Sequence, residues 1–269
     1  METILKDTSK SALIAAIEAN IFSLFGLFKY WPQAEFHDTV ELLRTITDIP
    51  YPLFNSVLRP QLPSGTIDEV IDSTLAEYQS RNVPMMWWTG PSTQPADLGR
   101  ILSERGLHES VSPGMAVDLT ALPENYPLPE GFLIKRVENE EELDIWSRVL
   151  TGVFEMPDFV TEAFFDFFLN LGFDAPLLNY IGSIDDEIVA TSSVFLGAGV
   201  AGIYNVATLE SARRRGIGAA MTAGPLLEAR SAGYRVSILE SSESGFNVYR
   251  KLGFQEYCKL YRHIWMGDQ

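Results

Sequence analysis

Arg213-Arg214-Arg215-Gly216-Ile217-Gly218-Ala219 is the most informative segment of this chain. It follows residues 202–208, which have the apolar character of a buried strand, and precedes residues 220–232, whose composition is typical of a helix. Backbone N–H groups at a helix N-terminus lack intrahelical partners, and the helix dipole favours an anion there. The glycines let phosphate oxygens approach the backbone, and the arginines attract a polyanion. The stretch predicts a pyrophosphate-binding turn; the alternative is a solvated basic turn before an ordinary helix.

The composition is that of an ordinary globular protein. The 269 residues suffice for one large domain or two smaller ones, and 46% of them are hydrophobic. The net charge of −16 argues against a nucleic-acid partner. The single cysteine, Cys258, has no second cysteine to pair with and favours a reducing compartment. We therefore expect a cytoplasmic protein.

Residues 11–28 form the most apolar segment of the chain. Glu18 and Asn20 interrupt it, so it falls short of the roughly 20 clean apolar residues that a membrane span needs. Its large apolar side chains recur at helical spacing, which places them on one face of a helix. These residues are Leu13, Ile17, Ile21, Leu24 and Phe28. We expect a core-facing helix and no membrane partner.

A proline-rich stretch, residues 122–131, divides the chain near its middle and favours an extended connection. We place the domain boundary there, giving domains 1–124 and 125–269. The second domain has the pattern strand, two helices, three strands, helix, strand, helix and strand. The first begins with the helix at 11–28, followed by a helix across residues 36–45.

The two domains share a pattern that indicates a diverged tandem repeat. Residues 85–89 parallel 236–240, and residues 102–109 parallel 249–256. Where the second copy has the basic turn, residues 60–69 of the first have two carboxylates and no arginine. Carboxylates at a helix start would repel a phosphate. Only the second copy is expected to bind a nucleotide-like ligand.

Two blocks now carry a family resemblance: Arg213-x-x-Gly216-x-Gly218, and the helix ending in Tyr249-Arg250-Lys251-Leu252-Gly253-Phe254. With both in this order, the chain from about residue 132 onward resembles a GNAT-type N-acetyltransferase. The first half resembles a degenerate copy without the cofactor loop. The resemblance implies a tandem acyl-CoA N-acyltransferase fold of the α/β (α+β) class, with a mixed, mostly antiparallel sheet flanked by helices. The chain has little room for a seventh strand after residues 254–265, which leaves the N-terminal half to complete the sheet.

The resemblance also implies which residues hold acetyl-CoA. In this family the strand before the signature bulges and pairs with the pantetheine arm, and the signature turn binds the pyrophosphate. Ser242 stands where many relatives have asparagine, and it can still hydrogen-bond a pantetheine carbonyl. The implied cofactor-binding residues are Val206, Ala207, Thr208, Arg213, Arg214, Arg215, Gly216, Ile217, Gly218, Ala219 and Ser242.

Catalytic roles follow from the same resemblance. The Val206 N–H would stabilise the oxyanion, and Tyr249 matches the tyrosine that protonates the departing thiolate. Glu240 and Glu243 are the nearby carboxylates for a general base. Solvation at the surface is the commoner fate of a glutamate, and a water relay could replace both, so the base stays open.

These implications predict an acetyl-CoA-dependent N-acetyltransferase acting on a primary amine of a small molecule or peptide. The acidic surface favours a cationic acceptor. A non-catalytic acyl-CoA-binding sensor or interaction module is the alternative. The sequence leaves open the acceptor, a longer acyl donor and a homodimer.

Other motifs point to no further ligand. His37, His108 and His263 match no metal-ligand spacing, so no metal is predicted. Residues 197–202 match Gly-x-Gly-x-x-Gly, but a strand follows instead of the helix that a dinucleotide site requires. We interpret them as a turn between antiparallel strands. The phenylalanine-rich helix at residues 158–171 favours core packing over an acceptor pocket.

Overall fold

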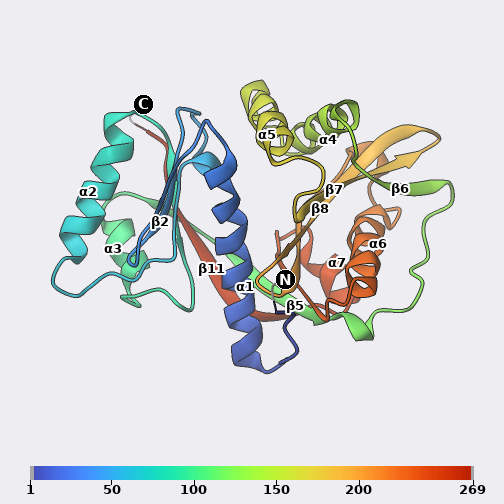
Figure 1. Cartoon of the computed structure of the whole chain (residues 1–269), viewed down its shortest axis with the longest axis horizontal. Helices are drawn as coiled ribbons and strands as arrows, with labels where there is room; N and C mark the ends of the chain where they lie inside the picture. The colour runs from blue at the N-terminus through green and yellow to red at the C-terminus, as the bar shows by residue number, and fades with distance from the viewer. Residues whose placement is uncertain (1–2, 268–269) are drawn as a thin grey trace. The chain divides into compact units, whose positions relative to one another are not determined.

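The computed structural model describes residues 3–267, and the chain folds into two compact units (Figure 1). Unit 1 contains the chain up to Ser23 together with Gly114–Tyr257. Unit 2 contains Leu24–Pro113 together with the chain from Cys258. Helix α1 (Lys10–Phe25) and strands β5 (His108–Asp118) and β11 (Gln255–Trp265) therefore each pass from one unit into the other.

Unit 1 has the strand order β5-β10-β9-β8-β7-β6. Besides α1 and β5, its elements are η3 (Leu119–Ala121), β6 (Phe132–Arg136), α4 (Glu140–Val153), α5 (Asp158–Leu171), β7 (Leu177–Ile184), β8 (Glu187–Gly197), β9 (Val200–Thr208), η4 (Glu210–Ala212), α6 (Ile217–Ser231), β10 (Val236–Glu240) and α7 (Phe246–Lys251). The order from β6 onward is the one predicted from sequence. All pairings are antiparallel except β9 with β10.

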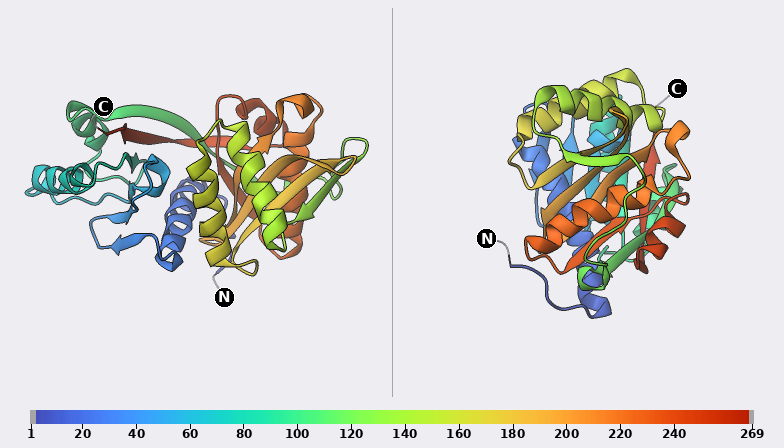
Figure 2. Two further views of the ribbon diagram at one scale, coloured as in Figure 1. Left: turned by 90° about the horizontal axis from the view of Figure 1, so that it is seen from above. Right: turned by 90° about the vertical axis from the view of Figure 1, so that its right-hand side faces the viewer.

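Helices cover both faces of the sheet in unit 1. Helix α4 packs on β8 and β9 and covers one face together with α5, whereas α6 packs on the same strands from the other face (Figure 2). Trp146 of α4 lies edge-on to Phe168 of α5, with ring centroids 4.8 Å apart. Phe164, Phe167 and Phe168 are buried, as core packing of the phenylalanine-rich helix predicts.

Helix α1 is anchored in unit 1 by a buried asparagine. The Asn20 side chain donates to the carbonyl of Gly197 at 2.7 Å and accepts from the Tyr204 hydroxyl at 2.7 Å. Gly202 lies directly beneath it, because a Cβ built there would meet the Asn20 Oδ1 at 2.1 Å. A larger residue at this position would push the helix off the strand.

The same helix, with its 3-10 extension η1 (Gly26–Tyr30), is apolar enough to cross a membrane by length and composition. The stretch Lys10–Tyr30 has mean hydropathy 1.8 and is the one such stretch in the described chain. Half of its most apolar window is buried inside the protein, and core helices of water-soluble proteins pass the same test. Four of the five predicted inward residues are buried, and Leu24 is half-buried.

Unit 2 has the strand order β1-β2-β3-β4-β11. Besides η1 and β11, its elements are β1 (Glu35–Asp38), β2 (Leu43–Ile46), η2 (Pro52–Phe54), β3 (Ser56–Leu58), α2 (Ile67–Ser80), β4 (Met85–Thr89) and α3 (Leu98–Glu104). Trp87 packs in a core with residues of α2 and α3, whereas Trp88 lies edge-on to Phe25, with centroids 5.8 Å apart. The two rings therefore point to opposite faces of β4, as expected for neighbours in a strand.

The helix predicted across residues 36–45 is wrong, because this segment forms the hairpin of β1 and β2. Thr39 accounts for the difference. Its hydroxyl accepts a hydrogen bond from the Leu42 N–H at 3.1 Å, and its own N–H donates to the Leu42 carbonyl at 2.9 Å. A threonine side chain that bonds the local backbone favours a turn over a helix.

The two copies of the repeat have exchanged their last strands. Each copy has a central strand, β4 or β10, that pairs in parallel with the strand before it. Residues 114–118 of β5 follow the first copy but pair antiparallel with β10. Residues 261–265 of β11 follow the second copy but pair antiparallel with β4. The expectation that the N-terminal half completes the second sheet is confirmed by the β5–β10 pairing.

The predicted boundary at residues 124 and 125 does not coincide with the division into units, which falls at Gly114 within β5. The proline-rich stretch is not a free connection, since the Arg230 guanidinium of α6 donates to the carbonyls of Leu119, Leu122 and Pro123. Leu122 is also buried in the core of unit 1. The start of the stretch is therefore packed on unit 1, while most of the remaining residues up to 130 are exposed.

We expect Gly202→Ala to destabilise unit 1 by about 1–3 kcal/mol, because the new methyl group overlaps Asn20 and Tyr204. Urea unfolding would measure the loss. Gly152→Ala is the matched control, since Gly152 is exposed in α4 with no atom near its Cβ position. It should gain up to about 1 kcal/mol. Equal effects of the two substitutions would contradict this account.

We expect the free energy of unfolding to decrease as the pH is lowered, and His263 to account for part of this decrease. The His263 ring is fully buried, with Nε2 3.0 Å from the Thr89 hydroxyl, and burial lowers its pKa below the usual 6.5 despite Glu109 at 3.9 Å. The unfolded chain then binds the proton more tightly, so this stability is complete above pH 6.5 and is lost below it. The slope reaches at most about 1.4 kcal/mol per pH unit.

Urea unfolding between pH 7.5 and pH 5 would measure this slope for His263→Gln and for His108→Gln, in which an exposed histidine is replaced. The His263 variant should lose part of the pH dependence, and the His108 variant should retain it. Wild-type pH dependence in both variants would rule out the buried imidazole as its source.

Candidate functional site

A β-bulge interrupts strand β9 at Asn205 and Val206. Thr191 of β8 pairs with Ala207, but Ser193 pairs with Tyr204, so two residues of β9 lie opposite the single residue Ser192. Asn205 adopts a left-handed conformation with φ of 54°. A bulge leaves the extra residue outside the hydrogen-bond ladder and bends the strand.

On its other side, β9 separates from β10 just before the bulge. The parallel pairing of the two strands ends at Ile203 and Leu239. Among the described residues, Val206 has no partner in the register of either neighbouring strand. Val206 and Thr208 are half-buried and Ala207 is buried. The site therefore contains a stretch of strand with one backbone edge free.

The basic turn closes against the end of this strand. Arg213 donates from Nε to the Thr208 carbonyl at 3.1 Å, while Arg214 and Gly216 adopt φ of 62° and 82°. Gly216 is the N-cap residue of α6, and within residues 3–267 no side chain caps this helix. The N–H groups of Ile217, Gly218 and Ala219 form the uncapped first turn. All three arginines are exposed. The uncapped start of α6 therefore lies next to three positively charged side chains.

The glycines of the turn leave room for a ligand. A Cβ built at Gly218 would meet the Thr208 hydroxyl oxygen at 3.8 Å, which is ordinary contact, and the one at Gly216 lies 4.0 Å from Pro129. Packing within the chain thus does not require glycine at position 218. A polyphosphate lying on the backbone would require it.

Tyr249 lies on the short helix α7 and is 9% exposed. Its ring packs edge-on against Phe254, with centroids 6.0 Å apart, and a Cβ at Gly245 would meet the ring at 2.7 Å. Burial raises the pKa of Tyr249 to about 12. The hydroxyl is therefore protonated at neutral pH and can act as a proton donor.

Ser242 and Glu243 lie in the exposed turn before α7. The Ser242 hydroxyl accepts from the Gly245 N–H at 3.2 Å, and its carbonyl accepts from the Phe246 N–H at 3.1 Å. This residue thus stabilises the start of α7. Glu243 faces solvent.

Glu240 lies at the end of β10 and is half-buried. The pKa of the Tyr204 hydroxyl is raised mainly by burial and further by the negative charge of Glu240. Of the two candidate bases, Glu240 is the one near the opening between β9 and β10.

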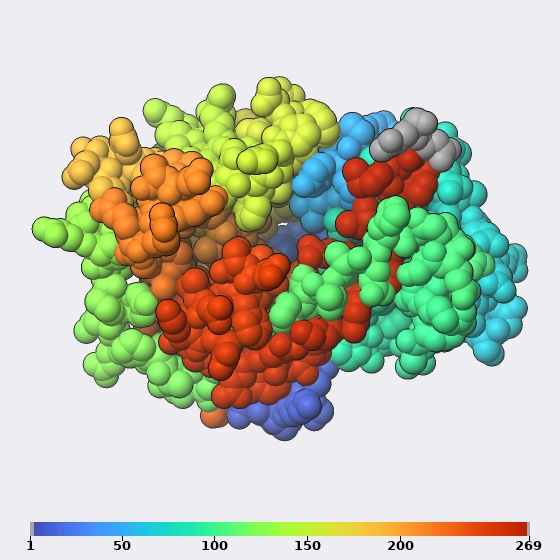
Figure 3. Space-filling view, turned by 180° about the vertical axis from the view of Figure 1, so that it is seen from behind, coloured from blue at the N-terminus to red at the C-terminus, as the bar shows by residue number. Residues whose placement is uncertain are grey.

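The elements that carry the predicted residues lie together in unit 1. Helix α6 packs on β9 and contacts α7, and both helices lie on the face shown in Figure 3, in orange and red. Helix α6 therefore contacts both the strand that ends at Thr208 and the helix that carries Tyr249.

Sequence reasoning missed the polar residues behind the bulge. Asn20 was interpreted as an interruption of an apolar helix, yet it is fully buried and bonds Tyr204, the residue before the bulge. Thr191, Ser193 and Asn179 are also buried and hydrogen-bonded around Asn205. The one sequence signal that could have identified them is the run of hydroxyl side chains Thr191-Ser192-Ser193 within an otherwise apolar strand.

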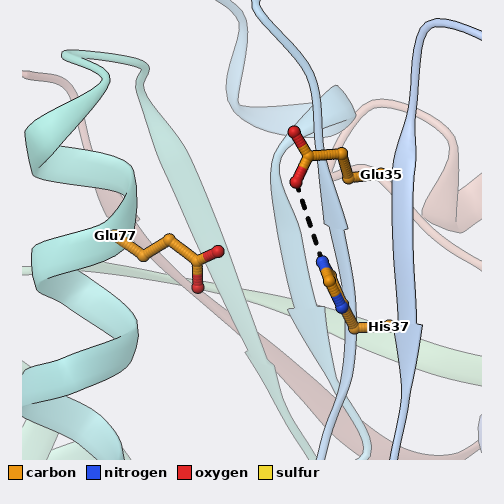
Figure 4. A group of neighbouring side chains, drawn as sticks. All are labelled: Glu35, His37 and Glu77. Atoms are coloured by element: carbon orange, nitrogen blue, oxygen red, sulfur yellow. Dashed lines mark ion pairs between the residues drawn. The ribbon is translucent and has the colours of Figure 1, made fainter.

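Unit 2 carries a cluster of possible metal ligands, Glu35, His37 and Glu77, with one ligand atom from each within 4.8 Å of the others (Figure 4). Both carboxylates are engaged by arginines. Arg81 donates to both oxygens of Glu35 at 2.6 and 2.9 Å, lowering the pKa of that carboxyl, and Arg44 donates to Glu77 at 2.5 Å. Two guanidinium groups neutralise the two carboxylates, so the cluster is an ion-pair network.

The helix of unit 2 that corresponds to α6 begins differently. The first turn of α2 contains Asp68 and Glu69, and Asp68 forms an ion pair with Arg105 at 2.6 Å. Negative side chains already complement the helix dipole there. The electrostatic difference between the copies that we expect from the sequence is present in the structure.

Comparisons with known proteins agree with this architecture. Residues 141–254 match the model of the acetyltransferase (GNAT) family. A GCN5-related N-acetyltransferase from Kribbella flavida has a TM-score of 0.72 at 18% identity, over 94% of this chain and 96% of that chain. One from Sphaerobacter thermophilus has a TM-score of 0.65 at 15% identity, over 100% and 96%.

A tandem GNAT protein from the clavulanic acid biosynthesis pathway has a TM-score of 0.63 at 12% identity, over 100% of this chain and 98% of that chain. No curated protein sequence matches this chain. At these identities the structural matches show the fold. The predicted resemblance and fold class are confirmed.

Proposed function

Because residues 141–254 form a GNAT acetyltransferase domain within a two-domain GNAT fold, we propose that this protein transfers an acetyl group from acetyl-CoA to a primary amine. The observation that carries the proposal is the combination of the bulged, half-open strand β9 with the uncapped start of α6. One offers free backbone to an extended arm, and the other offers N–H groups to a pyrophosphate.

In this proposal the residues of the basic turn hold the pyrophosphate of the co-substrate. The N–H groups of residues 217–219 point out of the helix start, and Arg214 and Arg215 supply positive charge. Arg213 instead fixes the turn through its bond to Thr208. Residues 206–208 pair with the pantetheine arm along the free edge of β9. Ser242 is the remaining candidate contact, at the turn before α7.

The reaction exchanges one bond for another and needs proton transfers at both the nitrogen and the sulfur. The amine nitrogen forms a bond to the thioester carbonyl carbon while the carbon–sulfur bond breaks. The attacking ammonium first loses a proton, for which Glu240 is the nearest candidate, directly or through water, with Glu243 the second. The departing thiolate takes a proton from Tyr249, which is protonated at neutral pH. The nitrogen loses its second proton as the amide forms, and this proton, carried through water, restores the Tyr249 hydroxyl. The Val206 N–H stabilises the oxyanion between these events.

The proposed acceptor is a cationic amine on a small molecule or peptide. The net charge of −16 attracts cations over a distance of about a Debye length. We also propose that the protein acts in the cytoplasm, where its single cysteine stays reduced.

We expect Gly218→Leu to abolish binding of CoA while leaving the fold intact. The leucine fills the space above the helix start, where an added Cβ meets no atom of the protein closer than 3.8 Å. Thermal-shift titration with CoA, desulfo-CoA and ATP would measure binding, because a ligand that binds the native state raises its melting temperature. The wild type should respond to both CoA species and not to ATP.

Gly152→Leu is the control, since it places the same side chain at an exposed position of α4. It should keep the wild-type response. Absence of any shift in folded wild-type protein would contradict the proposed function. Normal CoA binding by the Gly218→Leu variant would show that the basic turn is not part of the CoA-binding site.

We expect Tyr249→Phe to lower turnover by roughly 10²–10⁴-fold without weakening CoA binding, because it removes only the proton donor. Steady-state kinetics with a panel of amines and a CoA titration would measure the two effects. Tyr257→Phe is the matched control, since within residues 3–267 the hydroxyl that it removes bonds only to Gln255, at 3.5 Å. CoA binding with no turnover in the wild type would instead indicate an acyl-CoA sensor.

A further inference from the structure

We propose that Thr191 is a positioning residue for acyl transfer: its hydroxyl holds the peptide between Asn205 and Val206 so that the Val206 N–H faces the opening beside β9. The inference rests on the proposed function. It concerns the residues that orient the Val206 N–H, and these residues lie outside the two sequence blocks that carry the family resemblance.

The geometry begins with one hydrogen bond. Thr191 donates from Oγ1 to the carbonyl oxygen of Asn205 at 2.9 Å. In a trans peptide the carbonyl and the following N–H point in opposite directions. Strand β8, which carries Thr191, lies on one side of β9, and β10 lies on the other. A carbonyl tied toward β8 therefore turns the Val206 N–H toward β10, where the pairing of the two strands has ended.

A second anchor fixes the same bulge through the Asn205 side chain. Its amide nitrogen donates to the Ser193 hydroxyl at 3.1 Å, and Ser193 donates to the Asn179 side chain at 2.7 Å. Asn205 needs this support because φ of 54° is unfavourable for a residue with a Cβ, although asparagine tolerates it better than most. Two polar tethers thus hold both the carbonyl and the side chain of one strained residue.

Burial makes these tethers persistent. Thr191 and Ser193 are fully buried and Asn179 nearly so, so bulk water does not compete for their hydrogen bonds. An oxyanion donor is effective when it is held in place before the reaction, since no reorganisation is then needed as charge develops. A buried hydroxyl that fixes the peptide plane supplies this preorganisation without touching the substrate.

The test replaces Thr191 by valine, which keeps the shape and removes the hydroxyl. We expect kcat to fall by roughly 10–100-fold, less than or equal to the loss of a whole oxyanion donor, with KM for acetyl-CoA unchanged. Thr191→Ser should restore most of the activity. Thr151→Val is the matched control, since Thr151 is 2% exposed and its hydroxyl donates to the Ser147 carbonyl at 2.9 Å within α4.

A spectroscopic measurement separates positioning from turnover. The probe is acetyl-CoA labelled with ¹³C at the thioester carbonyl, because a hydrogen bond to that oxygen polarises the carbonyl and moves its resonance downfield. The wild type, Thr191→Ser and Thr151→Val should show the displaced resonance of the bound probe. In Thr191→Val the resonance of the bound probe should return toward that of free acetyl-CoA.

Unchanged kcat and an unchanged carbonyl resonance in Thr191→Val would overturn the inference, as would an equal loss in Thr151→Val. If the valine variant does not fold, Thr191→Ala takes its place, because it also removes the hydroxyl that bonds the Asn205 carbonyl; kcat and the carbonyl resonance should then change as expected for valine. A wild type that does not bind the probe would overturn the proposed function as well. Binding with an undisplaced resonance in the wild type would overturn this inference alone.

Discussion

The structure of unit 1 depends on a strand that must be paired on one side and open on the other. An unpaired backbone group inside a sheet is costly, and a strand that leaves its neighbour usually ends there. Strand β9 continues past Ile203, where its pairing with β10 ends, because on its other side it pairs with β8 again at Ala207 and Thr208. Thr191 and Ser193 bond the bulged residue, and Asn20 bonds Tyr204 just before it. These buried polar residues thus hold the bulge from β8 and α1 and leave the β10 edge of the strand open.

The sequence predicted the parts of the site that are local in the chain. The basic turn and the helix of Tyr249 each span a few residues, so glycine placement and periodicity identify them. It predicted that the N-terminal half completes the second sheet but not that β11 pairs with β4, because strand pairing depends on register between distant segments. It also missed Asn20, whose hydrogen-bond partners Gly197 and Tyr204 are remote in sequence. Only the prediction of a helix across residues 36–45 was wrong for a local reason, namely the turn that the Thr39 side chain stabilises.

The two copies share one topology, but only one of them has a candidate anion site. Both have a parallel pair of strands flanked by a strand from the other half of the chain. They differ at the helix that follows the first strand of that pair. Helix α6 starts after a glycine with positive φ, whereas α2 has Asp68 and Glu69 in its first turn. The two copies therefore differ in a few residues at one helix start: α6 leaves its N-terminal N–H groups available to a ligand, whereas side chains of the protein already complement the dipole of α2.

The strand exchange also has a consequence for synthesis of the chain. Strand β4 leaves the ribosome early, but its partner in β11 is made only after all of unit 1. Until then one edge of β4, with Trp87 and Trp88, lacks its neighbour, and such an edge is a template for pairing with other chains. The nascent protein must shield this edge for most of its translation. Neither half of the chain by itself contains all the strands of its unit, because β10 pairs with β5 and β4 pairs with β11.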